Sequence, residues 1–405
     1  MDLFEYQGKG LFAAAGIPVA RSRMVHAAEP GGSAGSGGAA APDQAATPDP
    51  GQAAADLGLP VVVKAQTLTG GRGKAGGVRR AETAEQVRAE AAQIMAMTIR
   101  GKPVVGVLIE QAVERERELY LALAVDRATR RPLLLFSTRG GVDIEAVARD
   151  DPQAMLRVSV DPLAGITAAQ AADVAAWAGL QGDLAAQLAA LLSAVWTVFT
   201  DHDATLVEIN PLAVVDGRLM ALDAKVTLDD NAAFRHPEWA AYQRQDDDRE
   251  RAARAAGIHY ITLHGDVGVL GNGAGMVMST LDLIAEAGGR PADFLDVGGG
   301  ARQERIAAAL DLILADAGVR ALCVTIFGGI TRCDEVARAL VAVLTAKGAE
   351  VAGLPVVVRL DGNGSAEGCR IVESAALPGV KAAASVWQAV QQAVAAAAAR
   401  GPNEG

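Results

Sequence analysis

The sequence has little of several things, and each scarcity excludes a class of protein. Its 405 residues include only three cysteines, Cys323, Cys333 and Cys369, which fit neither a disulfide framework nor the CxxC spacing of a metal site. There is no basic excess: the net charge is −11, which argues against a nucleic-acid surface. The start lacks a basic leader before an apolar stretch, and LLSAVWTVF is too short to span a bilayer. We expect a cytoplasmic protein without nucleic-acid or membrane partners.

The length favours two domains, because a single hydrophobic core stops growing beyond about 250–300 residues. Residues 27–53 form a Gly-, Ala-, Pro- and Ser-rich stretch without apolar periodicity, and we interpret about 27–53 as a flexible surface insertion. A polar run, RQDDDRERAARAAG, follows Tyr242. We place the domain boundary there, between residues 1–245 and 246–405.

The second half alternates apolar strands with helical segments, which predicts a parallel sheet covered by helices on both faces. Glycines follow the strands in GNGAG, GGGA, FGGI and DGNG. Ligands of open α/β sheets gather at these carboxyl ends. Thr331 and Asp334 in FGGITRCD resemble a capping box, so we expect a helix N-terminus that can bind an anion.

The stretch LVEINPLAVVDGRLMALDAK predicts a hairpin, because Asp-Gly favours a type I′ turn. Counting outward from that turn, Asn210 faces Asp223 and Glu208 faces Lys225. Strand alternation places Glu208 and Asn210 on one face, and Asp223 joins them on that face from across the ladder. Three oxygen ligands converging in this way suit Mg²⁺, although a solvated polar face has the same pattern.

TLTGGRGKAGG, directly after the apolar run VVVKAQ, surrounds Arg72 and Lys74 with glycines. Such a loop is either a plain turn or a phosphate cradle, and the cations, with Lys64 at the strand end, favour phosphate. GNGAG followed by Asp296 also mimics a dinucleotide fingerprint. NAD binding is thus a rival reading, although its third glycine is out of place and it leaves GGGA and FGGI without a role.

Seven ordered motifs carry a family resemblance: EYQGKGLF, GGRGKAGG, VEINPL, LGNGAGMVMSTLD, FLDVGGGA, IFGGITRCD and RLDGNGSAEG. Together they closely resemble the β subunits of ADP-forming succinyl-CoA synthetases over nearly the whole chain. The resemblance implies an α/β protein in which an N-terminal ATP-grasp domain is followed by a flavodoxin-like domain with a doubly wound parallel sheet. It also implies an α subunit as partner, in an αβ pair or a dimer of such pairs.

The resemblance also implies roles for individual residues. ATP or GTP would be bound through its phosphates by Lys64, Gly71, Arg72 and Gly73, and at its nucleoside end by Glu110 and Glu118. Mg²⁺ would be held by Asn210 and Asp223. Carboxylate substrate and phosphate would meet at Asn272, Gly329, Ile330 and Thr331, and Glu208 would act catalytically beside the phosphorylated group of the partner.

The implied chemistry is reversible ligation of succinate to coenzyme A through a phosphoenzyme, in the tricarboxylic acid cycle. The resemblance implies that the phosphorylated histidine belongs to the α subunit, and none of this chain's five histidines follows a glycine loop at a helix start. Two positions depart from the family pattern: Ala224 replaces the glycine of LDGK, and RLDGNG replaces RLDGNN. A malate-CoA ligase large subunit shares these motifs, and an inactive regulatory nucleotide-binding paralogue is a second alternative.

Overall fold

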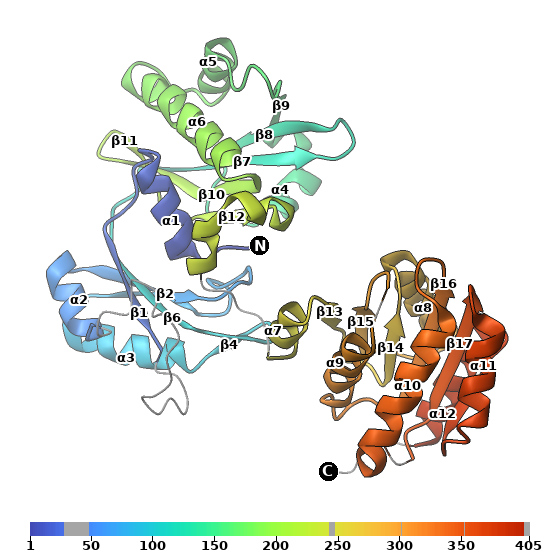
Figure 1. The fold of residues 1–405 in the computed structure, drawn as a ribbon. Helices are drawn as coiled ribbons and strands as arrows, with labels where there is room; N and C mark the ends of the chain where they lie inside the picture. The colour runs from blue at the N-terminus through green and yellow to red at the C-terminus, as the bar shows by residue number, and fades with distance from the viewer. Residues whose placement is uncertain (28–47, 243–247, 301, 352, 401–405) are drawn as a thin grey trace. The chain divides into compact units, whose positions relative to one another are not determined.

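The computed structural model describes residues 1–27, 48–242, 248–300, 302–351 and 353–400. The chain forms two compact units, Met1–Gln245 and Asp246–Gly405, and their boundary coincides with the one expected from the polar run. Figure 1 shows the first unit in blue to yellow-green and the second in olive to red.

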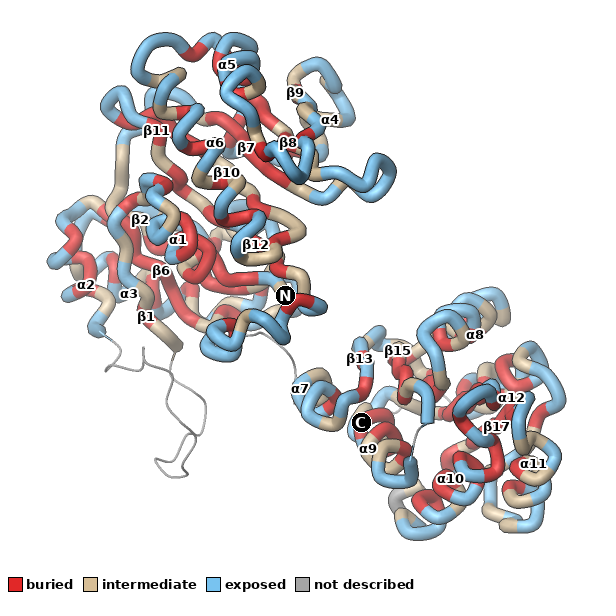
Figure 2. The backbone as a smooth tube through the Cα atoms, turned by 45° about the horizontal axis from the view of Figure 1, so that its top comes forward, coloured by how far each residue is buried: buried red, intermediate tan, exposed pale blue. Residues whose placement is uncertain are grey.

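A four-stranded antiparallel sheet, in the order β1-β6-β2-β3, forms one half of the first unit. Helices α2 and α3 contribute with it to one hydrophobic core, seen as buried segments in Figure 2. Because strand side chains alternate, Val61, Val63 and Ala65 enter this core while Lys64 points to the opposite face. The elements are β1 (Ser22–His26), α2 (Pro50–Leu57), β2 (Val61–Gln66), β3 (Val78–Ala81), α3 (Ala84–Met95), β4 (Thr98–Ile99), β5 (Lys102–Pro103) and β6 (Gly106–Gln111).

Helix α2 corrects the expected insertion. Residues 28–47 lie outside the described part of the chain, but Pro50–Leu57 are helical, with the Asp49 side chain accepting the Gln52 amide at 2.9 Å as N-cap. Ala53 is buried in the core of the small sheet. The interpretation of residues 50–53 as a flexible insertion was therefore wrong, because alanines that resemble linker composition here form the buried face of a helix.

The larger sheet of the first unit has the order β11-β10-β7-β8-β9, with β12 also paired to β10. Helices α1, α5 and α6 share its main hydrophobic core. Two short 3₁₀ turns, Asp230–Arg235 and Pro237–Ala241, end the unit. The elements are α1 (Glu5–Ala14), β7 (Arg117–Asp126), β8 (Arg131–Ser137), α4 (Ile144–Asp150), β9 (Leu156–Ser159), α5 (Ala168–Trp177), α6 (Asp183–Asp201), β10 (Ala204–Val215), β11 (Arg218–Ala221) and β12 (Lys225–Leu228).

Helix α6 is, among the described residues, the one helix long and apolar enough to cross a membrane by length and composition alone. A core helix passes the same test. The apolar side of α6 packs onto the larger sheet through Leu188, Leu192 and Val195, all fully buried.

The second unit is a six-stranded sheet in the order β13-β15-β14-β16-β17-β18. All neighbouring pairs are parallel except β13 with β15, so the five parallel strands follow the flavodoxin order 2-1-3-4-5 with one antiparallel edge strand added. The elements are α7 (Asp248–Ala255), β13 (His259–Thr262), β14 (Val267–Gly271), α8 (Ala274–Glu286), β15 (Asp293–Asp296), α9 (Gln303–Leu314), β16 (Ala321–Gly328), α10 (Cys333–Lys347), β17 (Val356–Gly362), α11 (Ser365–Ser374), β18 (Val380–Ala382) and α12 (Val386–Ala399).

Candidate functional site

Strand β10 and the residues after it form the expected hairpin. Both turn residues have positive φ, 47° for Asp216 and 66° for Gly217, as a type I′ turn requires. Glu208 pairs with Lys225, so the register counted from the sequence is confirmed. Between β11 and β12 three residues leave the ladder, and the middle one is Asp223.

The two expected metal ligands have different neighbours. Arg72 Nη2 donates to both carboxylate oxygens of Asp223, at 2.9 and 2.8 Å, and the Asp223 side chain is 34% exposed. Asn210 holds the loop after β8: its Oδ1 accepts from the Gly141 amide at 2.7 Å, and its Nδ2 donates to the Val142 carbonyl at 3.1 Å. The site therefore offers oxygen donors at Asp223 and Asn210, with Arg72 neutralising the carboxylate.

The glycine loop lies between β2 and β3 and turns back on itself, because Gly77 N–H donates to the Arg72 carbonyl at 2.8 Å. Gly71 has φ 82°, which favours glycine, and a Cβ added there would lie 3.1 Å from Arg100 Nη2. Gly71 and Gly73 are exposed, whereas Arg72 is half-buried. The loop thus presents bare backbone to solvent and anchors itself through one arginine.

Lys64 and Glu110 lie in a buried ion network instead of at separate ends of a site. Lys64 Nζ donates to Glu110 Oε1 at 2.6 Å, to Glu5 Oε1 at 3.1 Å and to the Leu222 carbonyl at 2.6 Å. Lys9 contacts the same three partners, with 2.8 Å to Glu5, 2.9 Å to Leu222 and a contact to Glu110. All three ammonium donors of Lys64 are therefore engaged by protein oxygens.

Glu5 is the centre of this network. Its Oε1 accepts from Lys9 and Lys64, and its Oε2 accepts from Arg72 at 2.7 Å and from Gln66 at 3.3 Å. Burial by itself raises the pKa of Glu5, but the charges of Lys64, Lys9 and Arg72 hold that pKa well below its usual value. Burial lowers the pKa of Lys64, but the charges of Glu5, Glu110 and Asp223 outweigh this effect and raise that pKa. The network carries three cations and three anions, counting Asp223.

Sequence reasoning did not assign a role to Glu5 or Lys9, although both stand in the EYQGKGLF motif. The available signal was their spacing of four residues on one helix face, which lies toward the small sheet and not toward solvent. A charged pair at this spacing is ordinary on exposed helices. Only the burial of both side chains, at 1% and 4% exposure, distinguishes this pair.

Glu118 has other partners than Glu110. Its side chain pairs with Arg115 at 2.6 Å, and its carbonyl accepts from the Gly140 amide at 3.0 Å. The carboxylate also lies against Gly141, where an added Cβ would be 2.1 Å from Oε2. Through Gly141 the structure brings Glu118 next to Asn210.

Glu208, the expected catalytic residue, is half-buried on β10. Burial raises the pKa of its carboxyl; Lys225 opposes this, whereas the nearby carboxylates of Asp223 and Glu145 raise that pKa further. A hydrogen bond joins it to the buried Tyr120 hydroxyl. A carboxyl with a raised pKa can bind or release a proton closer to neutral pH than an exposed glutamate can.

The second unit brings its four expected residues to the topological switch point between β14 and β16, where flavodoxin-like sheets bind ligands. Asn272 follows β14 and is joined to the end of β16: its Nδ2 donates to the Phe327 carbonyl at 2.9 Å, and its Oδ1 accepts the Phe327 amide at 2.8 Å. Gly329 and Ile330 are exposed in the loop after β16, and Thr331 is buried. The four residues therefore line one edge of the sheet.

The expected capping box was wrong. Helix α10 begins at Cys333 with Arg332 as N-cap, and no side chain caps its amides. Thr331 Oγ1 instead accepts from the Gly300 amide at 2.7 Å, tying FGGI to the GGGA loop. Asp334 pairs with Arg332 at 3.0 Å and with Arg338 at 2.6 Å, so two guanidinium groups, and not a helix N-terminal amide, engage its carboxylate.

Asp296, the acidic residue of the rival dinucleotide fingerprint, joins two glycine loops. Its Oδ1 accepts the amides of Gly273 and Gly298, both at 2.7 Å. This structural role accounts for an acidic residue at the strand end without a dinucleotide.

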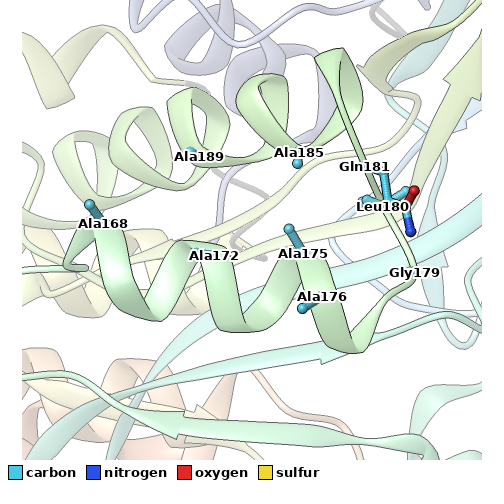
Figure 3. A pocket seen from close by; sticks show the side chains of 9 residues that line it. All are labelled: Ala168, Ala172, Ala175, Ala176, Gly179, Leu180, Gln181, Ala185 and Ala189. Carbon is cyan, nitrogen blue, oxygen red and sulfur yellow. The ribbon is translucent and has the colours of Figure 1, made fainter.

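A groove of about 400 Å³ lies elsewhere in the first unit, between α5 and α6 (Figure 3). Alanines line most of it, and Gln181 is its one polar side chain. It contains no titratable group, so it offers no chemistry for group transfer. In the described part of the chain no group of three or more His, Cys, Asp or Glu side chains could hold a metal ion.

Comparison with known proteins identifies both halves of the chain. The model of the ATP-grasp domain matches residues 38–214, and the CoA-ligase model matches residues 270–400. The β subunit of the ADP-forming succinate–CoA ligase of Rubrobacter xylanophilus is 45% identical over 397 residues, covering 97% of this chain and 98% of that protein. The chain belongs to this family of ligase β subunits. The corresponding subunit of Roseiflexus sp. is 44% identical over 99% of this chain and 100% of its own length.

The fold of these ligase β subunits also occurs in a more distant enzyme. The ATP citrate lyase of Methanothrix soehngenii, solved with citrate and coenzyme A, superposes with a TM-score of 0.74 at 19% identity, covering 97% of this chain and 99% of that one. At this identity the likeness concerns the fold alone. The architecture expected from the motifs, an ATP-grasp domain followed by a CoA-ligase domain, is confirmed by the two family matches.

Proposed function

We propose that this chain, together with an α subunit, catalyses the reversible ATP-dependent formation of succinyl-CoA from succinate and coenzyme A, a cytoplasmic step of the tricarboxylic acid cycle. The observation that carries the proposal is the 45% identity over 97% of the chain to a succinate–CoA ligase β subunit. The relatives' names specify succinate and ADP, which favours succinate over malate and ATP over GTP.

Arg72 is the first candidate for a phosphate ligand. It stands in the glycine loop, and the loop's exposed backbone can approach an anion closely. Lys64 has its three donors engaged, so it binds phosphate only by exchanging one protein acceptor for a phosphate oxygen. Both cations are present, which argues against an inactive paralogue.

Asn210 and Asp223 fit Mg²⁺ by the chemistry of their oxygens, because Asp223 is partly exposed and both belong to one hairpin, Asn210 on β10 and Asp223 between β11 and β12. The ion supplies neutralising charge to the transferring phosphoryl group when bound. To hold the ion, Asp223 would give up its contact with Arg72, while Arg72 would keep its contact with Glu5. One side of the Arg72 guanidinium would then be free to face a phosphate.

The phosphoryl group passes to a histidine of the α subunit, with Glu208 beside it. Among the described residues, the histidines of this chain are poor candidates: His236, for example, stacks on Trp239 at 4.3 Å between Asp203 and Glu238. Asn272 and the loop of Gly329, Ile330 and Thr331 would bind succinate and phosphate at the switch point of the second unit.

The test is turnover of the purified chain with and without its α subunit. Alone, the chain is expected to bind ATP·Mg but to form no acyl-CoA. With α it is expected to form succinyl-CoA and to prefer succinate to malate in kcat/KM. Acyl-CoA formation by the chain alone, or preference for malate, contradicts the proposal.

A further inference from the structure

Three side chains that approach the proposed nucleotide site converge on a single carboxylate, that of Glu5 on α1. Lys64 comes from β2, Arg72 from the glycine loop and Lys9 from the next turn of α1. These segments are distant in sequence, since 59 residues separate Glu5 from Lys64. Glu5 therefore fixes a strand cation and a loop cation relative to each other.

The two lysines hold different positions in this arrangement. Lys9 is 4% exposed, whereas Lys64 is 11% and Arg72 is 14% exposed, so Lys9 lies deepest. Because Lys9 contacts the same acceptors as Lys64, it keeps Glu5 and Glu110 compensated when Lys64 turns toward another anion. The Glu5–Lys9 pair is the anchor of the network, and Lys64 and Arg72 are its outward members.

Arg72 depends on Glu5 in particular. Its other side-chain partner is Asp223, an expected metal ligand, and the Ala65 carbonyl accepts one further bond at 3.1 Å. With a metal ion bound at Asp223, Glu5 would be the remaining anion that holds Arg72. Without Glu5 the guanidinium is drawn wholly to Asp223, away from a phosphate and in competition with the metal.

We propose that Glu5 is a positioning residue of the nucleotide site, which sets Lys64 and Arg72 for the β- and γ-phosphates from the N-terminal helix. This inference rests on the proposed function, since it assumes that those cations bind nucleotide phosphates. A buried ion group adds little net stability relative to apolar packing, so its value lies in fixed geometry.

The test compares ATP·Mg with AMP, which lacks the β- and γ-phosphates, by equilibrium binding to the full-length chain alone and with its α subunit. Glu5→Gln keeps the shape and removes the charge. We expect its affinity for ATP to fall about tenfold or more, the loss expected for misplacing one charge-assisted hydrogen bond, while its affinity for AMP is unchanged. The matched control is Glu90→Gln on α3, which removes the ion pair with Arg79 of β3 and should alter neither affinity.

A second variant separates positioning from folding. Glu5→Gln leaves three buried cations facing two anions, whereas Glu5→Gln with Lys9→Met restores the charge balance. The double variant should regain thermal stability yet remain weak for ATP. Recovery of ATP affinity together with stability, or an equal loss for ATP and AMP, overturns the inference. Failure of the unmodified chain to bind ATP would instead overturn the proposed function.

Discussion

Asp223→Asn is the substitution that isolates the proposed metal ligand most cleanly. The amide keeps the size of the side chain but removes the anion, and one amide oxygen remains to accept from Arg72 or from the Ala224 amide, now 2.8 Å from Oδ1. Asn is also a weaker ligand for a hard cation than a carboxylate. The change therefore acts on the metal site with little change of shape.

The expected size of the effect of Asp223→Asn follows from the surroundings of Asp223. The side chain is 34% exposed and Arg72 keeps Glu5 at 2.7 Å, so the loss of stability should be about 1 kcal/mol or less, or roughly 2–4 °C in the midpoint of the first unit. Loss of charge neutralisation at the phosphoryl group is larger, about 3 kcal/mol, which corresponds to about a hundredfold in kcat.

The assay is succinyl-CoA formation with the α subunit as a function of free Mg²⁺, with thermal melting in parallel. Asp216→Asn is the matched control, because it is the same chemical change in the same hairpin and Asn-Gly also suits a type I′ turn. Normal turnover of Asp223→Asn at limiting Mg²⁺, or an equal loss in the control, refutes the reasoning.

Gly8→Ala should destabilise the first unit although alanine favours helices, because the new methyl would lie 3.1 Å from the Ala224 methyl; adding Ala224→Gly should recover the melting midpoint, and additive effects would contradict this. Burial raises the pKa of Asp293 well above its usual value, so the unmodified chain loses stability as pH rises from about 4 through that raised pKa. Asp293→Asn should therefore gain relative stability with rising pH, and parallel melting curves from pH 4 to 8 would count against it. Hydrogen bonding to Asp203 raises the pKa of His236, so its stabilising contribution is complete below about pH 6.5 and is lost as pH rises through the raised native value. His236→Gln should lower the melting midpoint more at pH 5.5 than at pH 9, and an equal loss at both contradicts the reasoning. With γ-labelled ATP, the isolated chain should acquire no acid-labile phosphate, and label on any of its histidines would refute the two-subunit relay.

Ala224, which stands in place of the glycine of the family pattern LDGK, has a neighbour that the local sequence does not indicate. In sequence the residue is only a missing glycine beside an expected metal ligand. In the structure its methyl packs against Gly8 of α1, more than two hundred positions away, where no side chain competes for the space. The substitution is accommodated by a residue whose relevance no local motif indicates.

Elements governed by neighbouring residues could be predicted from the sequence. Asp216 and Gly217 determine the turn and, through the two-residue period of strands, which side chains face each other from Glu208 to Lys225. The alternation of strands and helices in the second unit likewise predicted its parallel sheet. Each of these inferences needs only chain geometry within a few tens of residues.

Tertiary structure alone decided the partners of the charges. Glu5, Lys9, Lys64 and Arg72 come from three segments, and nothing in their local sequence distinguishes a buried network from solvated side chains. The same holds for Thr331, whose hydroxyl accepts from the Gly300 amide and does not cap α10. It also holds for the alanines of α2, which lie in the hydrophobic core and not in a linker. The physical reason is that burial and hydrogen bonding are settled by which surfaces meet, and long-range packing overrides local preference wherever a polar group must find a partner away from water.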